Sequence, residues 1–181
     1  MQEIRTGRLL LRPFRESDGG DLYEFLSRLR DDEFEGYPGI TAENSREHLG
    51  QRLGSEEFHA VELVQSGRVI GNITCGNRGF AAKEVGYIIS KGCQQQGYAT
   101  EALSVVIAQA FRDGAHRVYA ECDARNVPSW KLLEKVGLRR EAHFRQNIWF
   151  RRDENGTPVW KDTLVYAILE SEMERGRIRK G

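Results

Sequence analysis

The amino-acid sequence predicts a mixed α/β fold with one mixed sheet and helices on both faces. The first observation is a unit at 84–110, where a β-branched run precedes a polar loop with glycine and then a helical pattern. The second is a pair of long strand-like runs near the C terminus, separated by the turn sequence DENG at 153–156. The 181 residues are enough for one domain, which we expect over 1–181 with a frayed tail from about 176.

The composition excludes several classes of protein. The 27 basic and 27 acidic residues balance, which argues against a nucleic-acid-binding protein that works by long-range attraction. The three cysteines, Cys75, Cys93 and Cys122, are far apart without metal-binding spacing, which predicts no metal site, no disulfide framework and a reducing cytoplasm. The N terminus does not resemble a signal peptide, and no apolar run reaches the roughly 20 residues of a membrane span, so we expect no membrane association.

The N-terminal third reads as a strand followed by two helices. Residues 8–14 are strand-like, and Pro13 limits the length of that strand. Ser17 and Asp18 are candidate N-caps for a helix up to about residue 29. A loop at 31–40 and a polar, weakly amphipathic helix at 41–53 follow.

The rest of the chain alternates strands and helices. The hydrophobic patterns and turn residues predict, in order, strands at 58–65 and 68–75, a strand at 84–90, a helix at 99–111, a strand at 117–124, a helix at 126–136 and two strands flanking 153–156. The 84–123 unit should be a parallel right-handed crossover, and the hairpins should be antiparallel.

The loop at 93–98 is a candidate anion site. Gly97 allows close approach of the backbone, and the helix that follows presents free amides and the positive end of its dipole. These two properties together favour a phosphate or pyrophosphate.

Residues 94–99, QQQGYA, fit the pattern Q/R-x-x-G-x-G/A of the acetyl-CoA site of the GNAT N-acetyltransferases. The chain resembles that family, in particular its RimJ/RimL branch of ribosomal-protein acetyltransferases. The resemblance also covers, in order, RLLLRPFRESD, GRVIGNI, EVGYIIS, NVPSWKLLEKVGL and WKDTLVYAI. It implies a mostly antiparallel, twisted GNAT-like sheet in which the family's fourth and fifth strands are parallel and splayed.

The resemblance implies acetyl-CoA as the co-substrate. Loop amides would hold its pyrophosphate, and the fourth strand would line the acyl-pantetheine arm, with amides near Ile88 polarising the thioester carbonyl. The residues implied in binding are Tyr87, Ile88, Ile89, Gln94, Gln95, Gln96, Gly97, Tyr98, Ala99, Thr100, Asn126 and Ser129. Many relatives have glycine where Gln95 stands.

Acetyl transfer to an amine needs a group that assists the leaving thiolate. Many GNAT enzymes use a tyrosine, but Leu133 occupies that position here. The RimL-like branch instead implies Ser129, with Asn126 orienting the pantetheine arm or a water. The same two residues are also typical of a helix cap.

The general base is the less defined of the catalytic groups. Glu84, at the start of the family's fourth strand, is the first candidate by resemblance. Glu62, Glu121, Asp123 and His143 are alternatives, as is water alone.

The sequence therefore predicts a cytoplasmic acetyl-CoA-dependent N-acetyltransferase. Its acceptor would be a primary amine, on a protein N terminus or a small molecule, and acidic residues at 31–35 could attract it. Trp149 and Trp160 are candidates for lining the acceptor cleft, and exposed edges of the C-terminal hairpin would allow a homodimer. The alternative function is a non-catalytic acyl-CoA-binding or ribosome-associated module.

Overall fold

The computed structural model describes residues 3–29, 34 and 40–173. The strands are β1 (Ile4–Arg5), β2 (Leu9–Arg12), β3 (Phe58–Leu63), β4 (Val69–Asn77), β5 (Ala82–Ile89), β6 (Arg117–Asp123), β7 (Arg139–Arg152) and β8 (Pro158–Leu169). The helices are η1 (Glu16–Asp18), α1 (Gly19–Ser27), α2 (Ser45–Gly50), η2 (Lys91–Cys93), α3 (Tyr98–Arg112) and α4 (Val127–Lys135). The predicted tail from 176 and most of the acidic 31–35 segment lie outside the described residues.

Eight strands form one sheet in the order β1-β2-β3-β4-β5-β6-β8-β7. Every neighbouring pair is antiparallel except β5 and β6, which are parallel. β5 and β6 are the strands that the resemblance equates with the family's fourth and fifth. Their pairing runs only from Ala82 with Arg117 to Glu84 with Tyr119. The predicted mixed fold, with a splayed parallel pair, is confirmed.

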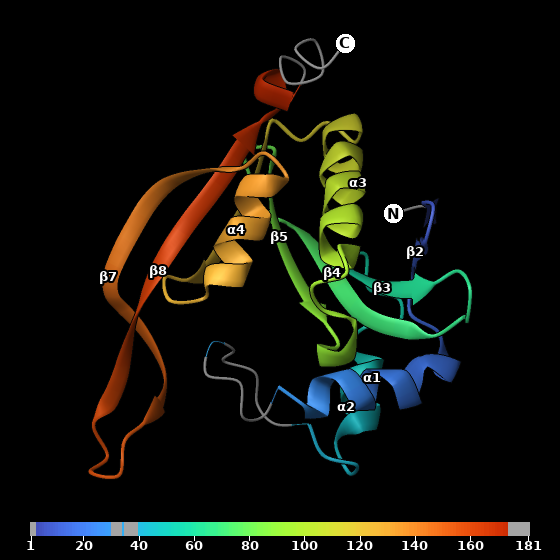
Figure 1. The fold of residues 1–181 in the computed structure, drawn as a ribbon, viewed down its shortest axis with the longest axis horizontal. Coiled ribbons are helices and arrows are strands. Elements are labelled where there is room, and N and C mark those ends of the chain that lie inside the picture. The colour runs from blue at the N-terminus through green and yellow to red at the C-terminus, as the bar shows by residue number, and fades with distance from the viewer. Residues whose placement is uncertain (1–2, 30–33, 35–39, 174–181) are drawn as a thin grey trace.

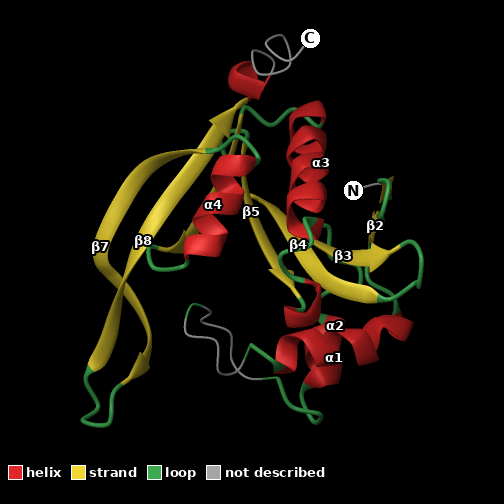
Figure 2. Cartoon of the chain, in the orientation of Figure 1, coloured by secondary structure: helices red, strands yellow, loops and turns green. Residues whose placement is uncertain are grey.

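Helices cover both faces of the sheet (Figures 1 and 2). The apolar stripe of α3, which includes Leu103 and Ile107, packs against β2, β4 and β5 in the larger buried cluster. On the opposite face, Leu22 and Phe25 of α1 join Leu49 of α2 in a second cluster. The sheet therefore separates two hydrophobic cores.

The second predicted helix is shorter than the 41–53 pattern suggested. The helix α2 begins only at Ser45, because Asn44 Oδ1 accepts a hydrogen bond from the Thr41 amide at 2.8 Å and holds a turn before it. Asparagine side chains compete in this way with helical backbone bonds.

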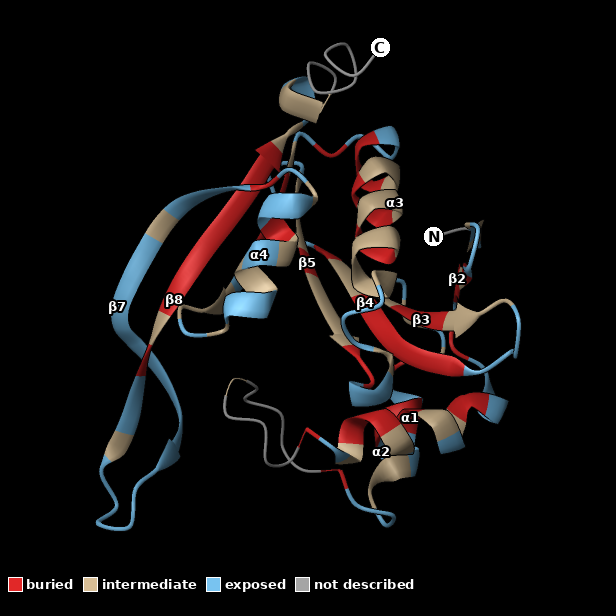
Figure 3. Cartoon of the chain, in the orientation of Figure 1, coloured by how far each residue is buried: buried red, intermediate tan, exposed pale blue. Residues whose placement is uncertain are grey.

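The hairpin of β7 and β8 projects away from the rest of the sheet. Figure 3 shows β7 as an almost wholly exposed strand, whereas the C-terminal half of β8 is buried between β6 and β7. Because β8 pairs with β6 only from Thr163 to Leu169, the part of the hairpin before Thr163 extends beyond the sheet (Figure 1).

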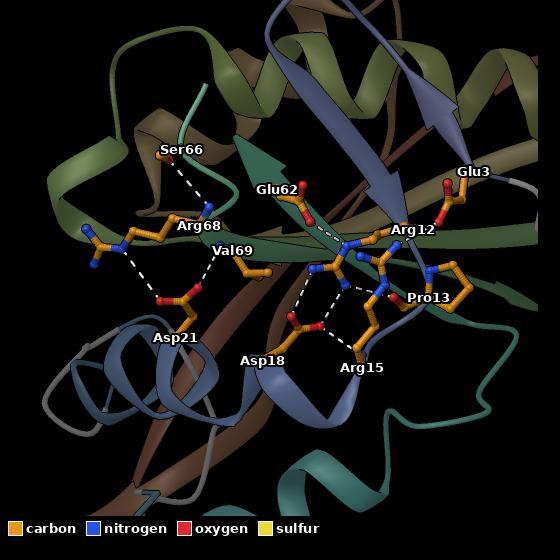
Figure 4. A network of polar contacts seen from close by, with 10 residues as sticks. All are labelled: Glu3, Arg12, Pro13, Arg15, Asp18, Asp21, Glu62, Ser66, Arg68 and Val69. Carbon is orange, nitrogen blue, oxygen red and sulfur yellow. Dashed lines mark hydrogen bonds and ion pairs between the residues drawn. The ribbon is translucent and has the colours of Figure 1, made fainter. Parts of the chain in front are cut away.

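A buried ion-pair network links the turn before α1 to strands β2 and β3 (Figure 4). Arg12 is 2% exposed and Asp18 4%, and their side chains form two parallel hydrogen bonds of 2.7 and 2.8 Å. Glu62 on β3 accepts a third bond from Arg12. These partners, Asp18 first, raise the pKa of the guanidinium further above its usual value. Asp18 precedes α1 as predicted, but its carboxylate accepts from Arg12 and from the Arg15 amide and makes no side-chain cap bond.

The substitution Asp18→Ala should lower the free energy of unfolding by about 3 kcal/mol or more, because it leaves a buried guanidinium short of charge compensation. Urea unfolding at pH 7 measures the loss. Glu3→Ala is the matched control, since Glu3 pairs with Arg15 at the exposed surface and should cost less than about 1 kcal/mol. Equal losses for the two variants would contradict a structural role for the buried network.

Candidate functional site

A cavity of about 810 Å³ opens where β5 and β6 part. Tyr87, Ile88 and Ile89 line it from β5, and residues 120–123 line it from β6. The remaining walls come from the polar loop, the starts of α3 and α4, the β7–β8 hairpin, and residues of β3, β4 and the α1–α2 region. Of the residues implied by the resemblance, the lining includes Tyr87, Ile88, Ile89, Gln94, Gln95, Gly97, Tyr98, Ala99, Thr100, Asn126 and Ser129. Gln96 and Glu84 do not line it.

The polar loop has two residues in the left-handed backbone region. Gly97 has φ of 82° and directly precedes α3, while Gln95 has φ of 59°. Glycine adopts this conformation freely, and a residue with a Cβ pays roughly 1 kcal/mol for it. Gln95 thus adopts a backbone conformation that glycine would favour, at some cost in strain. The first amides of the fifteen-residue helix α3 lack intrahelical partners and can bind an anion.

Arg8, just before β2, holds this loop in place. Its Nη1 donates to the Gln96 carbonyl at 2.9 Å, its Nε donates to Glu101 at 2.7 Å, and its guanidinium stacks over the Tyr98 ring. Burial opposes ionisation of Glu101, but hydrogen bonds from Thr6 and Arg8 outweigh it and lower its pKa. Arg8 was not predicted as part of this site, because a strand pattern gives no indication of a contact with a residue 88 positions along the chain.

Hydroxyl groups meet on the α4 side of the cavity. The Tyr87 hydroxyl lies 2.7 Å from Ser129 Oγ and 3.1 Å from the Ser129 carbonyl. Burial raises the pKa of the Cys122 thiol to about 11, and a hydrogen bond from Ser129 opposes that rise. Asn126 caps α4, because its Oδ1 accepts from the Ser129 amide at 3.2 Å. Leu133 is fully buried in the core.

The carboxylates that were candidates for the base differ in their surroundings. Glu84 pairs with Arg78 at 2.7 Å. Glu121 lines the cavity and has no hydrogen-bond or ion-pair partner among the residues that the structure describes. Burial, and then repulsion from Glu84, raise the pKa of Glu121 above its usual value. Glu62 belongs to the Arg12 network.

The hairpin side of the cavity contains a buried ion pair. Lys161 Nζ lies 3.2 Å from Asp123, and both side chains are almost completely buried. Burial opposes ionisation of Asp123, but hydrogen bonds from Arg125 and Lys161 outweigh it, so its pKa lies below the usual range. Phe150 packs its ring under the Lys161 ammonium.

The aromatic residues of the hairpin are arranged differently from the prediction. Ile148 and Phe150 line the cavity, whereas Trp149 and Trp160 do not. Those two tryptophans face each other across the strands and are largely exposed. His143 lies 2.7 Å from Asp162 on the same exposed hairpin.

Two comparisons identify the fold and its family. Residues 8–139 match the model described as an acetyltransferase (GNAT) domain. The chain belongs to the GNAT acetyltransferase family. An uncharacterized N-acetyltransferase of Bacillus subtilis, YnaD, is 31% identical over 173 residues, which cover 93% of this chain and 98% of YnaD.

Solved structures agree with this assignment. A GNAT-family acetyltransferase from Bacillus anthracis superposes with a TM-score of 0.84 at 28% identity, covering 94% of this chain and 99% of that one. RimJ from Mycobacterium smegmatis, solved in complex with CoA-disulfide, has a TM-score of 0.75 at 23% identity, with coverage of 92% and 88%. That second likeness shows a shared fold.

Membership of the GNAT family makes this chain an acetyltransferase, and the family's donor is acetyl-CoA. Within the described residues, no three or more His, Cys, Asp or Glu side chains are grouped so that they could hold a metal ion. None of the helices described has the length and apolar character that a membrane crossing needs.

The substitution Asp123→Asn should destabilise the protein by about 3 kcal/mol at pH 7, because it removes the charge that compensates buried Lys161. The native pKa of Asp123 is below its value of 3.8 in an unfolded chain. Its charge therefore stabilises the fold fully above pH 3.8, and this contribution is lost as the pH falls through the native pKa. Urea unfolding at pH 7 and near pH 3 should show the wild-type advantage shrinking.

Glu154→Gln, in the exposed turn of the hairpin, is the control and should change little at either pH. A difference between wild type and Asp123→Asn that stays constant with pH would contradict the ion-pair explanation.

Proposed function

We propose that this chain transfers the acetyl group of acetyl-CoA directly to a primary amine, on a protein N terminus or a small molecule. The observation that carries the proposal is the cavity between the unpaired inner edges of β5 and β6, which begins at the left-handed loop before α3. An extended pantetheine arm fits such an opening, since it can accept and donate hydrogen bonds like an added strand.

The donor site consists of the loop and β5. Amides from about Gln95 to Thr100 bind the pyrophosphate, with Gln94, Gln96, Tyr98 and Ala99 completing the loop, and Arg8 adds positive charge beside them. Tyr87, Ile88 and Ile89 line the arm, and an amide near Ile88 polarises the thioester carbonyl. Asn126 places Ser129 by capping α4, and Ser129 donates to the departing sulfur.

Glu121 is the base that the geometry favours, with Glu84 as the alternative from the sequence. A base must reach the acceptor ammonium with an unoccupied carboxylate, and its pKa should be raised toward the working pH. Glu121 meets these conditions, because it lines the cavity, lacks a cationic partner among the described residues and has a raised pKa. Glu84 is engaged by Arg78.

The acceptor enters between the hairpin and the α1–α2 face. Leu29, Phe34 and Phe58 line that end of the cavity, together with Ile148 and Phe150 of the hairpin. The fold is also similar to that of a ribosomal-protein-S5-alanine acetyltransferase from Vibrio fischeri, which supports a protein N terminus as one acceptor class. The three free cysteines fit the expected cytoplasmic location. A homodimer through the exposed edge of β7 stays a prediction.

Incubating the protein with acetyl-CoA and a panel of small amines and peptide N termini, while following release of free thiol, tests the proposal. The wild type should turn over at least one class of amine. Gly97→Val should weaken acetyl-CoA binding at least tenfold in calorimetry, because φ of 82° strains a β-branched residue and its Cβ would lie 3.3 Å from Arg8. Gly156→Val, at φ of 77° in the distant hairpin turn, is the matched control and should bind normally.

CoA binding without turnover on any amine would favour the non-catalytic module. Equal binding by the Gly97 and Gly156 variants would refute the assignment of the loop.

The substitutions Glu121→Gln and Glu84→Gln decide between the two bases. Loss of a general base costs about a hundredfold or more in rate, and we expect this for Glu121→Gln. Glu84→Gln should retain turnover but shift the acid limb of kcat/KM to lower pH, because the Glu84 charge raises the pKa of Glu121. The pH–rate profiles of both variants measure this. A large loss for Glu84→Gln alone would make Glu84 the base.

A further inference from the structure

The hydroxyl pair on the α4 side of the cavity has a geometry that packing alone does not require. The Tyr87 side chain extends from β5 to the first turn of α4, where its hydroxyl lies 2.7 Å from Ser129 Oγ. Both residues line the cavity. A phenylalanine would fill the same volume but lack the hydroxyl, which lies 3.1 Å from the Ser129 carbonyl and closer, at 2.7 Å, to Ser129 Oγ.

Ser129 also neighbours a sulfur within the protein, the thiol of Cys122, which lines the same cavity. Its hydrogen bond favours the thiolate form of the neighbouring Cys122 side chain. A hydroxyl that accepts a hydrogen bond from a phenol becomes a better donor itself, since hydrogen bonds in a chain polarise one another.

A serine hydroxyl alone is a poor acid. Because leucine replaces the usual tyrosine in α4, another group must supply the proton for the leaving sulfur. The phenol of tyrosine has a pKa of about 10 and a thiol one of about 8.5. A proton passed from a phenol to a thiolate therefore moves between groups of similar affinity, whereas a serine alkoxide would be far too basic to persist.

We propose that Tyr87 is a positioning residue for Ser129 and the source of the proton that reaches the CoA sulfur. The inference rests on the proposed function. The amine nitrogen forms the bond to the acetyl carbon, and the electron pair of the broken C–S bond stays on sulfur. Ser129 gives its proton to that sulfur and takes the proton of Tyr87. The phenolate regains a proton from water, and the acceptor amine loses one to the base.

The geometry explains how the site works without a tyrosine in α4. The phenol is supplied from β5, and Ser129 relays its proton because its Oγ lies 2.7 Å from the Tyr87 hydroxyl. The arm must therefore pass beside the Tyr87–Ser129 pair, which places the sulfur within reach of Ser129.

The test compares Tyr87→Phe, Ser129→Ala and the double variant, with Tyr23→Phe on the exposed surface of α1 as control. Tyr87→Phe should lower kcat about tenfold or more while KM for acetyl-CoA changes less than about twofold. The double variant should be no slower than Ser129→Ala, because the two groups act as one unit. Additive losses, or a kcat for Tyr87→Phe within twofold of wild type, would overturn the inference.

A second readout does not depend on turnover. Ultraviolet difference titration of CoA bound to the protein should show its thiol ionising at lower pH in the wild type and Tyr23→Phe than in Tyr87→Phe. Identical thiol titrations would overturn the relay even where wild-type turnover is normal. Absence of turnover in the wild type with every amine would instead count against the proposed function.

Thermal unfolding checks that each variant folds. If Tyr87→Phe is unstable, 3-fluorotyrosine at position 87 keeps the ring and the hydroxyl while lowering the pH at which a phenol ionises. The alkaline limit of kcat should then move to lower pH, and an unmoved limit would overturn the inference.

Discussion

The site depends on the early end of pairing between β5 and β6. After Glu84 and Tyr119, β5 stays paired with β4 and β6 stays paired with β8, so two inner edges diverge with unpaired amides and carbonyls. Buried backbone groups without partners are costly. An extended ligand that is rich in amides would remove that cost, and this supports the pantetheine arm as the proposed occupant of the opening.

Neighbouring elements keep the inner edges of β5 and β6 apart and form the two ends of the opening. Antiparallel partners hold β5 and β6 on their outer sides, and α3 packs against β5 while α4 packs against β6 and β8. At one end, Arg8 fixes the loop through Gln96 and Glu101. The Arg12–Asp18 pair continues this anchoring from the other end of β2 and sets where α1 begins. The acceptor side is thereby built on a rigid sheet even though loops line part of it.

The sequence predicted those features of the fold and the site that short-range patterns determine. The loop at 94–99 and its glycine follow from a local motif, and Gln95 has a positive φ that glycine would adopt without strain. Arg8 was missed because its partners lie far along the chain. Asp18 follows the local rule for a helix N-cap, but a buried guanidinium binds its carboxylate more strongly than a backbone amide would. Trp149 and Trp160 face each other as facing runs imply, but their neighbours Ile148, Phe150 and Lys161 line the cavity, so alternation along each strand leaves the two tryptophans outside it.

Strand alternation also explains how acid and base come to lie on opposite faces of one sheet. Tyr87 and Cys122 pack with the core beneath α3 and α4, and Ile88 packs with the core beneath α1 and α2. Glu121 neighbours Cys122 in the strand, so it faces the acceptor side. In the proposed mechanism, the leaving sulfur meets hydroxyl groups on one face, while the incoming amine meets the Glu121 carboxylate on the other. Since the acetyl carbon must lie between them, the splay is the place where the two faces connect, and a fully paired sheet would keep base and acid permanently apart.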